Sequence, residues 1–230
     1  MHRTMADAML LLSSSIARAA PEGELTVRQH RRIMIDMCLR RQKPGTGTSS
    51  LGLRERTAMN PWPDLRDVLK GIPWVIAGGV ATRAYMPERA TKDLDVLVRA
   101  GDGDVVLARL ESAGYELVST LGIPGYVLRS PDDVEIDVLL SDAAWLSEAF
   151  AQVGHDAAGL PVLALPYLVL MKLTAMRSQD WADVSRMLGL AAETELELVR
   201  DVVRRYSPED TEDLEALIVL GRREAQFPDR

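Results

Sequence analysis

The sequence has little cysteine, little histidine and no long apolar run. Its single cysteine, Cys38, cannot form an internal disulfide, and it excludes a cysteine-rich zinc module. The three histidines (His2, His30 and His155) offer little material for a histidine metal site or a Ser-His-Asp triad. No stretch approaches the roughly 18–20 apolar residues of a membrane-spanning helix. The short apolar stretch at 8–12 is a poor secretory signal. We therefore expect a cytoplasmic protein without membrane contact.

Charge is distributed unevenly over the 230 residues, whose net charge is −7. Residues 1–60 carry 10 basic and 5 acidic side chains, whereas residues 61–230 carry 17 and 29. The basic arm either contacts nucleic acid or is a solvated extension. With 47% hydrophobic residues, the rest of the chain can form a substantial core. We expect a basic extension, partly helical or disordered (1–58), a core (59–150) and a C-terminal helical region that completes the site (151–230).

From residue 61 onward the hydrophobic pattern is that of an α+β domain. Alternation and short apolar runs predict strands at 73–77, 93–98, 115–120, 126–129 and 134–140. Helical spacing predicts helices at 64–70, 80–85, 104–113, 166–177, 180–188 and 195–206, and a last one from Ser207–Pro208 to about residue 223. Residues 154–156 are typical of a turn. The pattern therefore predicts a small mixed β-sheet with flanking helices, followed by a C-terminal helical cap.

Three carboxylates lie on two of the predicted strands. Asp93 and Asp95 are two residues apart, so both side chains leave the same face of one strand, and Asp137 alternates with apolar neighbours on a later strand. If these strands pair, the three acids converge, which is unfavourable unless a cation neutralises them. Carboxylate oxygens at this density suit Mg²⁺ or Mn²⁺, and two such ions can hold the attacking and leaving oxygens of phosphoryl transfer. The alternative is that these are exposed acids on the wet face of a sheet.

A glycine pair and two polar residues precede the acids. Gly78 and Gly79 follow a predicted buried strand and precede a helix, a position that exposes backbone N–H groups to a phosphate. Thr91 can offer its hydroxyl to a phosphate or to a neighbouring ligand, and Arg89 can offset the charge of the acids. A glycine pair alone is a weak signal, since many turns contain one.

Together these segments resemble the nucleotidyltransferase superfamily of the polymerase-β type. The segments are Gly78-Gly79-Val80-Ala81, Arg89-Ala90-Thr91-Lys92-Asp93-Leu94-Asp95 and Glu135-Ile136-Asp137. The C-terminal helices resemble the AbiEii-type toxin branch, whose Lys-x-x-Ala…Arg…Asp-x-x-Asp pattern is matched by Lys172, Ala175, Arg177, Asp180 and Asp183. The resemblance covers about half of the chain, 74–188. Many superfamily members have Gly-Ser where this chain has Gly-Gly, as the toxin branch tends to have.

The resemblance implies a magnesium-dependent enzyme that moves a nucleoside monophosphate from a nucleoside triphosphate (NTP) to an acceptor and releases pyrophosphate. It implies that Asp93 and Asp95 hold both metal ions. Asp137 would complete the metal site and help to deprotonate the attacking hydroxyl. Gly78 and Gly79 would then cradle the triphosphate, with Arg89 and Thr91 beside it.

Lys172 is implied as a further catalytic and nucleotide-binding residue. It lies on an otherwise apolar helix, where a lysine is costly to bury without an anion, and a triphosphate would supply one. The alternative is a lysine that extends to solvent from the edge of the helix. Asp180 and Asp183 either orient Lys172 or Arg177, bind the substrate, or favour the helix dipole as first-turn acids.

The biological role follows only from the family resemblance, which suggests a toxin of a toxin–antitoxin or abortive-infection pair. The expected partners are an NTP, an RNA such as tRNA or a protein as acceptor, and a cognate antitoxin. A second interpretation is a small-molecule nucleotidyltransferase that modifies a cationic, aminoglycoside-like antibiotic, which the acidic body suits. A third is a catalytically silent nucleotide- or protein-binding module of the same fold. The intact set of three acids speaks against the third.

Overall fold

The computed structural model describes residues 62–87, 91, 93–175 and 177–226. All of them belong to one of the two units into which the chain divides, Lys43–Arg230. The expected extension at 1–58 and the candidate residue Arg89 lie outside the described residues. Within the described part of the chain, no helix is both long enough and apolar enough to cross a bilayer.

A mixed β-sheet forms the centre of the described unit. Its order is β3 (Glu116–Thr120), β4 (Gly125–Arg129), β5 (Glu135–Ser141), β2 (Asp93–Arg99), β1 (Trp74–Ile76), β7 (Pro161–Val162) and β6 (Gly154–His155). Strand β2 is parallel to β5, and β1 is parallel to β7. The other neighbouring strands are antiparallel. Each of the five predicted strands corresponds to one of β1–β5. In β2 and β5 the acids alternate with buried apolar residues at their start, whereas β1 is a short run that is buried throughout.

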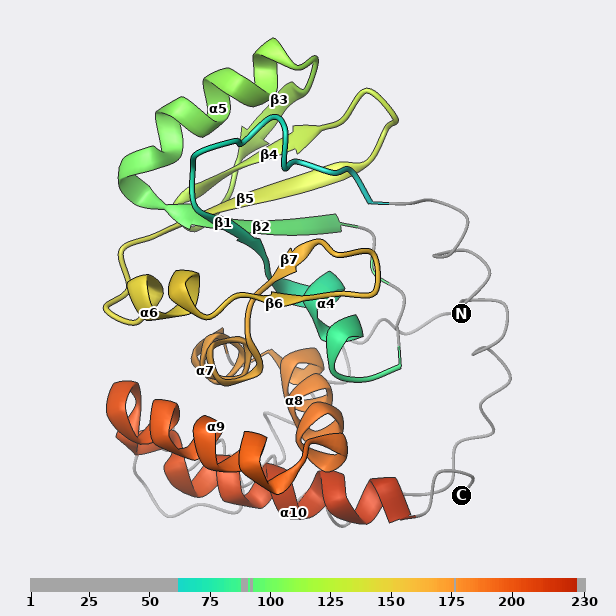
Figure 1. The fold of residues 1–230 in the computed structure, drawn as a ribbon, viewed down its shortest axis with the longest axis vertical. Coiled ribbons are helices and arrows are strands. Elements are labelled where there is room, and N and C mark those ends of the chain that lie inside the picture. Colours follow the sequence, from blue (N-terminus) through green and yellow to red (C-terminus); the bar gives the residue numbers. More distant parts are fainter. Residues whose placement is uncertain (1–61, 88–90, 92, 176, 227–230) are drawn as a thin grey trace, which may run out of the picture. The chain divides into compact units, whose positions relative to one another are not determined.

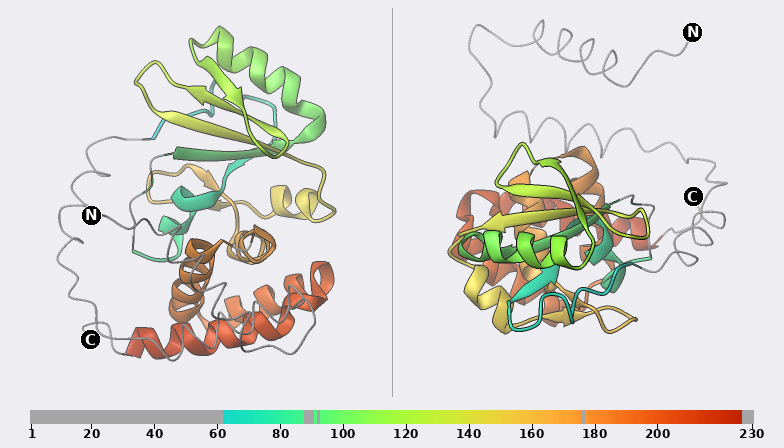
Figure 2. Two further views of the ribbon diagram at one scale, coloured as in Figure 1. Left: turned by 180° about the vertical axis from the view of Figure 1, so that it is seen from behind. Right: turned by 90° about the horizontal axis from the view of Figure 1, so that it is seen from above.

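Helices lie on both sides of this sheet. They are α4 (Gly78–Ala81), α5 (Gly103–Ser112), α6 (Leu146–Ala151), α7 (Leu165–Ala175), α8 (Ser178–Leu190), α9 (Glu193–Tyr206) and α10 (Thr211–Gln226), with short 3₁₀ turns η1 (Thr82–Ala84), η2 (Ala100–Asp102) and η3 (Pro208–Asp210). Figure 1 shows α5 on one side of the sheet, and α4, α6 and α7 on the other side. Helix α8 begins beside α7, and α9 and α10 form a further layer beyond these two helices, as the view from behind in Figure 2 also shows. The predicted α+β fold with a C-terminal helical cap is confirmed.

The predicted helix at 64–70 is wrong. This segment forms turns, in which the amide of Leu69 bonds the carbonyl of Leu65 over 2.8 Å. Both leucines are fully buried, so the helical spacing reflected their burial beside the sheet. The segment ends at Gly71, whose φ of +80° is not helical. One turn of chain is too short to sustain a helix once nucleation is included.

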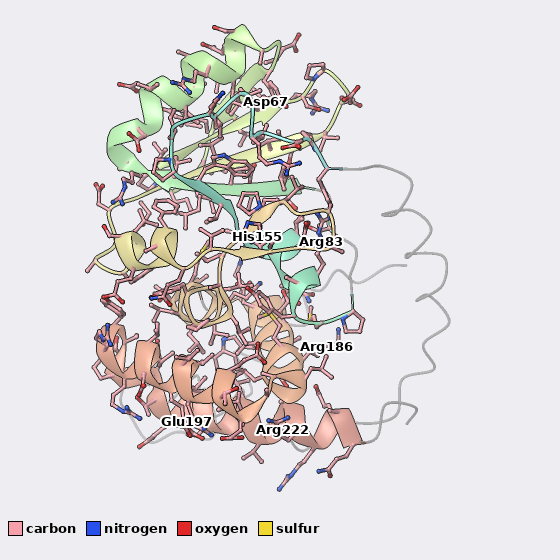
Figure 3. The ribbon with its side chains drawn as sticks, in the orientation of Figure 1. Asp67, Arg83, His155, Arg186, Glu197 and Arg222 are labelled. Atoms are coloured by element: carbon pink, nitrogen blue, oxygen red, sulfur yellow. The ribbon has the colours of Figure 1, made fainter. Side chains whose placement is uncertain are left out.

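The predicted turn at 154–156 is also only partly right, because β6 and β7 form a hairpin there. Asp156 lies in its loop, where its carboxylate accepts hydrogen bonds from the amides of Ala158 and Leu160, both over 2.9 Å. The same carboxylate pairs with Arg83 of η1, and Figure 3 shows that Arg83 lies on the same side of the molecule as the hairpin. The exposed His155 is therefore a strand residue. This hairpin extends the sheet beyond residue 150.

Helices α8 and α10 pack with their backbones in close approach. A Cβ atom on Gly221 would overlap the carbonyl oxygen of Ser185, and one on Gly189 would overlap the backbone of Gly221. Arg222, which is labelled in Figure 3, donates to the carbonyls of Gly189 and Ala191 over 3.0 and 2.8 Å. These bonds satisfy carbonyls at the end of α8 that have no partner within the helix.

We expect Gly221→Ala to destabilise the protein. The added methyl group would push α10 away from α8, and overpacking of this kind typically costs about 1–3 kcal/mol. Denaturant unfolding of the variant measures the loss. Gly101→Ala is the matched control, because a Cβ atom at that position has no neighbour within 4 Å. Equal stability of the two variants would contradict the close helix contact.

Candidate active site

The parallel pairing of β2 with β5 brings the three predicted acids together. Asp95 and Asp137 are direct register partners, and Asp93 lies two residues before Asp95 on the same face of β2. One oxygen from each carboxylate lies within 4.8 Å of the other two. All three side chains are half-buried. The predicted convergence of these acids therefore exists in the folded chain.

Close approach and burial make this acid cluster resist ionisation. Burial is the main cause that raises the pKa of Asp95, to about 6, and the charges of Asp93 and Asp137 add to it. Burial also raises the pKa of Asp137, with contributions from Asp93 and Glu135. Oδ1 of Asp137 is buried and has no hydrogen-bond partner among the described residues. An unpartnered buried oxygen beside two other carboxylates fits a divalent cation that accepts oxygen ligands.

The glycine pair lies directly against Asp95. The carboxylate of Asp95 accepts a hydrogen bond from the amide of Gly79, which favours the ionised form. Gly78 has a φ of +56°, and a Cβ atom there would overlap the Asp95 carboxylate. A residue with a side chain would therefore displace the acid. The pair thus positions Asp95, a role that the sequence analysis did not include, and contact with a triphosphate stays a prediction.

Thr91 supports the other acid of β2. Its hydroxyl donates to Oδ1 of Asp93 over 2.8 Å. Of the two roles considered for Thr91 from the sequence, the structure shows a contact with Asp93, which is a candidate metal ligand, and contact with a phosphate stays a prediction. This bond orients the Asp93 carboxylate.

Lys172 lies at the junction of α7 and α8, where it is buried between two acids. Its ammonium donates to Oδ1 of Asp180 over 2.9 Å and to Oδ2 of Asp183 over 2.8 Å. The lysine is 3% exposed, and the two acids are 1% and 0% exposed. The alternative of a lysine extending to solvent is therefore wrong. Asp180 and Asp183 therefore supply the negative charge that the buried lysine requires. Contact of Lys172, Asp180 or Asp183 with a nucleotide stays a prediction.

Arg177, which precedes the first turn of α8, completes this group. Its Nε donates to Oδ2 of Asp180 over 2.7 Å and its Nη2 to Oδ1 over 3.3 Å. Burial is the largest influence on Asp180 and raises its pKa, but the bonds from Arg177 and Lys172 hold the pKa below its usual value. Unlike Lys172, the Arg177 side chain is 70% exposed. Its charge also acts on Asp95, where it lowers the pKa.

Arg177 is not among the site residues predicted from the sequence, where it is only part of the family pattern and a possible partner of Asp180. A usable signal existed, since an arginine three residues before an acid at the start of a helix can bond that acid. What the sequence could not reveal is that Lys172 is buried and that Arg177 is exposed.

A mixed sheet with three converging carboxylates on adjacent parallel strands, next to a glycine pair and a helical cap, defines a nucleotidyltransferase. A family model described as "Nucleotidyl transferase AbiEii toxin, Type IV TA system" matches residues 64–229. The chain belongs to this nucleotidyltransferase family. None of the curated proteins matches the sequence.

Several solved structures are similar to this chain at low sequence identity and low TM-score. ANT(2″)-Ia in complex with adenylyl-2″-tobramycin is 14% identical with a TM-score of 0.41, over 68% of this chain and 93% of that one. Lincomycin-bound LnuA, a lincosamide antibiotic adenylyltransferase, is 11% identical with a TM-score of 0.34, over 68% and 96%. A CCA-adding enzyme with CTP is 14% identical with a TM-score of 0.34, over 72% and 49%. None of these similarities indicates which acceptor substrate this chain uses.

Proposed function

We propose that the protein is a Mg²⁺- or Mn²⁺-dependent nucleotidyltransferase that moves a nucleoside monophosphate from an NTP to an RNA acceptor such as tRNA, and that it acts as a toxin. The observation that carries the metal-dependent chemistry is the acid cluster, in which Asp137 has a buried oxygen without a partner among the described residues. Family membership supports the toxin role. We also propose a cognate antitoxin as a partner for the same reason.

The residues of the cluster have distinct proposed roles. Asp93, Asp95 and Asp137 would hold the metal ions, which neutralise phosphate charge when bound. Thr91 fixes Asp93, and the Gly79 amide fixes Asp95. Asp137 accepts the proton of the acceptor hydroxyl. The hydroxyl oxygen then bonds to the α-phosphorus, the bond from this phosphorus to the bridging oxygen breaks, and pyrophosphate leaves.

Both expected parts of the described chain contribute to this proposed site. Asp93, Asp95 and Asp137 come from the region 59–150, while the group around Arg177 comes from 151–230. The charge of Arg177 reaches Asp95 across that boundary. We therefore propose that the C-terminal helical region completes the site and that neither part is sufficient by itself.

The experiment that tests the function follows a labelled nucleotide. The protein is incubated with each α-labelled NTP, Mg²⁺ or Mn²⁺, and either total RNA or an aminoglycoside. We expect label in RNA with the wild type and none with Asp95→Asn. Expression of the wild type, but not of the variant, should arrest growth. Label on the aminoglycoside alone would favour the small-molecule alternative, and NTP binding without any transfer would favour the silent module.

A further inference from the structure

Four charged side chains meet at the α7–α8 junction, and their two positive and two negative charges sum to zero. They are Lys172, Arg177, Asp180 and Asp183, of which only Arg177 is exposed to solvent. Lys172 is held by Asp180 and Asp183, and all three are at most 3% exposed. The amide of Gln179 also donates to Asp183, over 3.2 Å. Two of the three N–H groups of the ammonium are already used, and the side chain is only 3% exposed, so a phosphate could contact it only by displacing the groups that cover it. The lysine is therefore poorly placed to contact a nucleotide.

Arg177, in contrast to the buried Lys172, is exposed to solvent. Asp180 holds its Nε and Nη2, and this two-point contact fixes the plane of the guanidinium. Its Nη1 has no hydrogen bond among the described residues, and the side chain is 70% exposed. Figures 1 and 2 show that α8 begins on the side of the helical layer that faces α4 and the sheet. Arg177 is at this end of α8 and has an N–H group available for a ligand.

The charge of Arg177 also reaches the acid cluster. It stabilises the ionised form of Asp95, and Asp93 and Asp95 in turn raise the pKa of Arg177. Lys172 is not among the causes that act on Asp95 or Asp137. Among the described cations, the exposed Arg177 rather than the buried Lys172 is the one whose charge acts on Asp95.

We propose that Arg177 contacts the triphosphate of the bound nucleotide, and that Lys172 is a positioning residue that acts on Arg177 through Asp180. This inference rests on the proposed function, since it concerns the same site. One oxygen of Asp180 is shared between Lys172 and Arg177, so the buried lysine sets the orientation of the carboxylate that fixes the arginine. Arginine suits this role, because its planar fork binds a carboxylate and a phosphate at the same time.

The test measures binding, so it does not need the acceptor. Wild type, Arg177→Ala and Arg177→Lys are titrated in Mg²⁺ with the four NTPs, the corresponding monophosphates and inorganic tripolyphosphate. We expect Arg177→Ala to weaken NTP and tripolyphosphate binding about 10- to 100-fold, the range of charge-assisted hydrogen bonds, and to leave monophosphate binding nearly unchanged. Arg177→Lys should recover part of the loss. Arg186→Ala is the matched control, because Arg186 is an exposed arginine on the same helix (Figure 3).

The positioning role of Lys172 has its own test, a double-mutant cycle. Asp180→Asn should weaken NTP binding when Arg177 is present and have little further effect in the Arg177→Ala background, because both changes remove the same contact. Lys172→Met should show the same dependence on Arg177 if it folds, as judged by circular dichroism. Additive effects on affinity in the two cycles would overturn the positioning role and place Asp180 or Lys172 in direct contact with the nucleotide.

The outcomes separate this inference from the proposed function. If the wild type binds an NTP and Arg177→Ala binds it equally well, the inference is overturned and the proposed function stands. If the wild type binds no NTP in Mg²⁺ or Mn²⁺, both are overturned. A selective loss of triphosphate binding in Arg177→Ala, with Arg186→Ala unchanged, supports the inference.

Discussion

Asp95→Asn is expected to abolish nucleotidyl transfer and, at the same time, to stabilise the metal-free protein at pH 7–8. The pKa of Asp95 rises from 3.8 to about 6 on folding, mainly through burial. Between these values the folded chain holds a proton that the unfolded chain has lost, so stability falls as the pH rises, and the loss levels off above about pH 7, one unit past the folded pKa. A shift of this size corresponds to about 3 kcal/mol. Asparagine removes the charge and keeps an oxygen for the Gly79 amide.

The pH dependence separates this effect from an ordinary mutational change. Unfolding free energies of wild type and Asp95→Asn are measured with a chelator from pH 4 to pH 8. The advantage of the variant should be smallest near pH 4 and grow to a plateau above pH 7. Mn²⁺ at pH 7.5 should stabilise the wild type but not the variant. Asp67→Asn, a change at an exposed turn carboxylate (Figure 3), is the control. A difference that does not vary with pH would contradict the burial of an ionised Asp95.

The sequence predicted well those parts of the fold whose burial is periodic. Strands β2 and β5 have alternating acids and apolar residues, and α5 ends at Ser112, one residue short of the predicted range and just before Gly114, whose φ is +88°. Pairs of residues that are close in the chain, such as Asp93 and Asp95, could be placed on one face from spacing alone. Their approach to Asp137 depended on which strands pair. Hydrophobic alternation predicts each strand but not its neighbour in the sheet. The convergence of the three acids was therefore predicted only for the case that these strands pair, and the family resemblance supported that case.

The errors and omissions share one physical cause, which is dependence on tertiary contacts. Strands β6 and β7 have two residues each, too few for any alternation to be visible. The turn around Leu65 and Leu69 has helical spacing only because both leucines reach the core. The partners of Lys172 were named from the sequence only as one alternative, since Asp180 and Asp183 also fit a solvated first turn. Burial decided between these alternatives, and burial is a property of the packed helices.

Lys172→Met is expected to destabilise the protein by about 3–5 kcal/mol, the usual cost of removing one partner from a buried ion pair. Methionine fills a similar volume but leaves Asp180 and Asp183 without the ammonium that both contact. Arg177 still pairs with Asp180, whereas Asp183 keeps the hydrogen bond from the Gln179 amide but loses its contact with the ammonium, so we expect the larger cost at Asp183. The second change in Lys172→Met/Asp183→Asn should therefore recover part of the stability.

Denaturant unfolding of these two variants, beside Lys70→Met, measures the predicted effect. Lys70 is exposed, so its replacement should change stability little. A loss below about 1 kcal/mol for Lys172→Met, as expected for a solvent-exposed lysine, would contradict the buried pair. A double variant no more stable than Lys172→Met would contradict the expected cost at Asp183. Recovery in the double variant would instead show that the ammonium is required because of the charge of Asp183, since the same methionine is then tolerated beside a neutral asparagine.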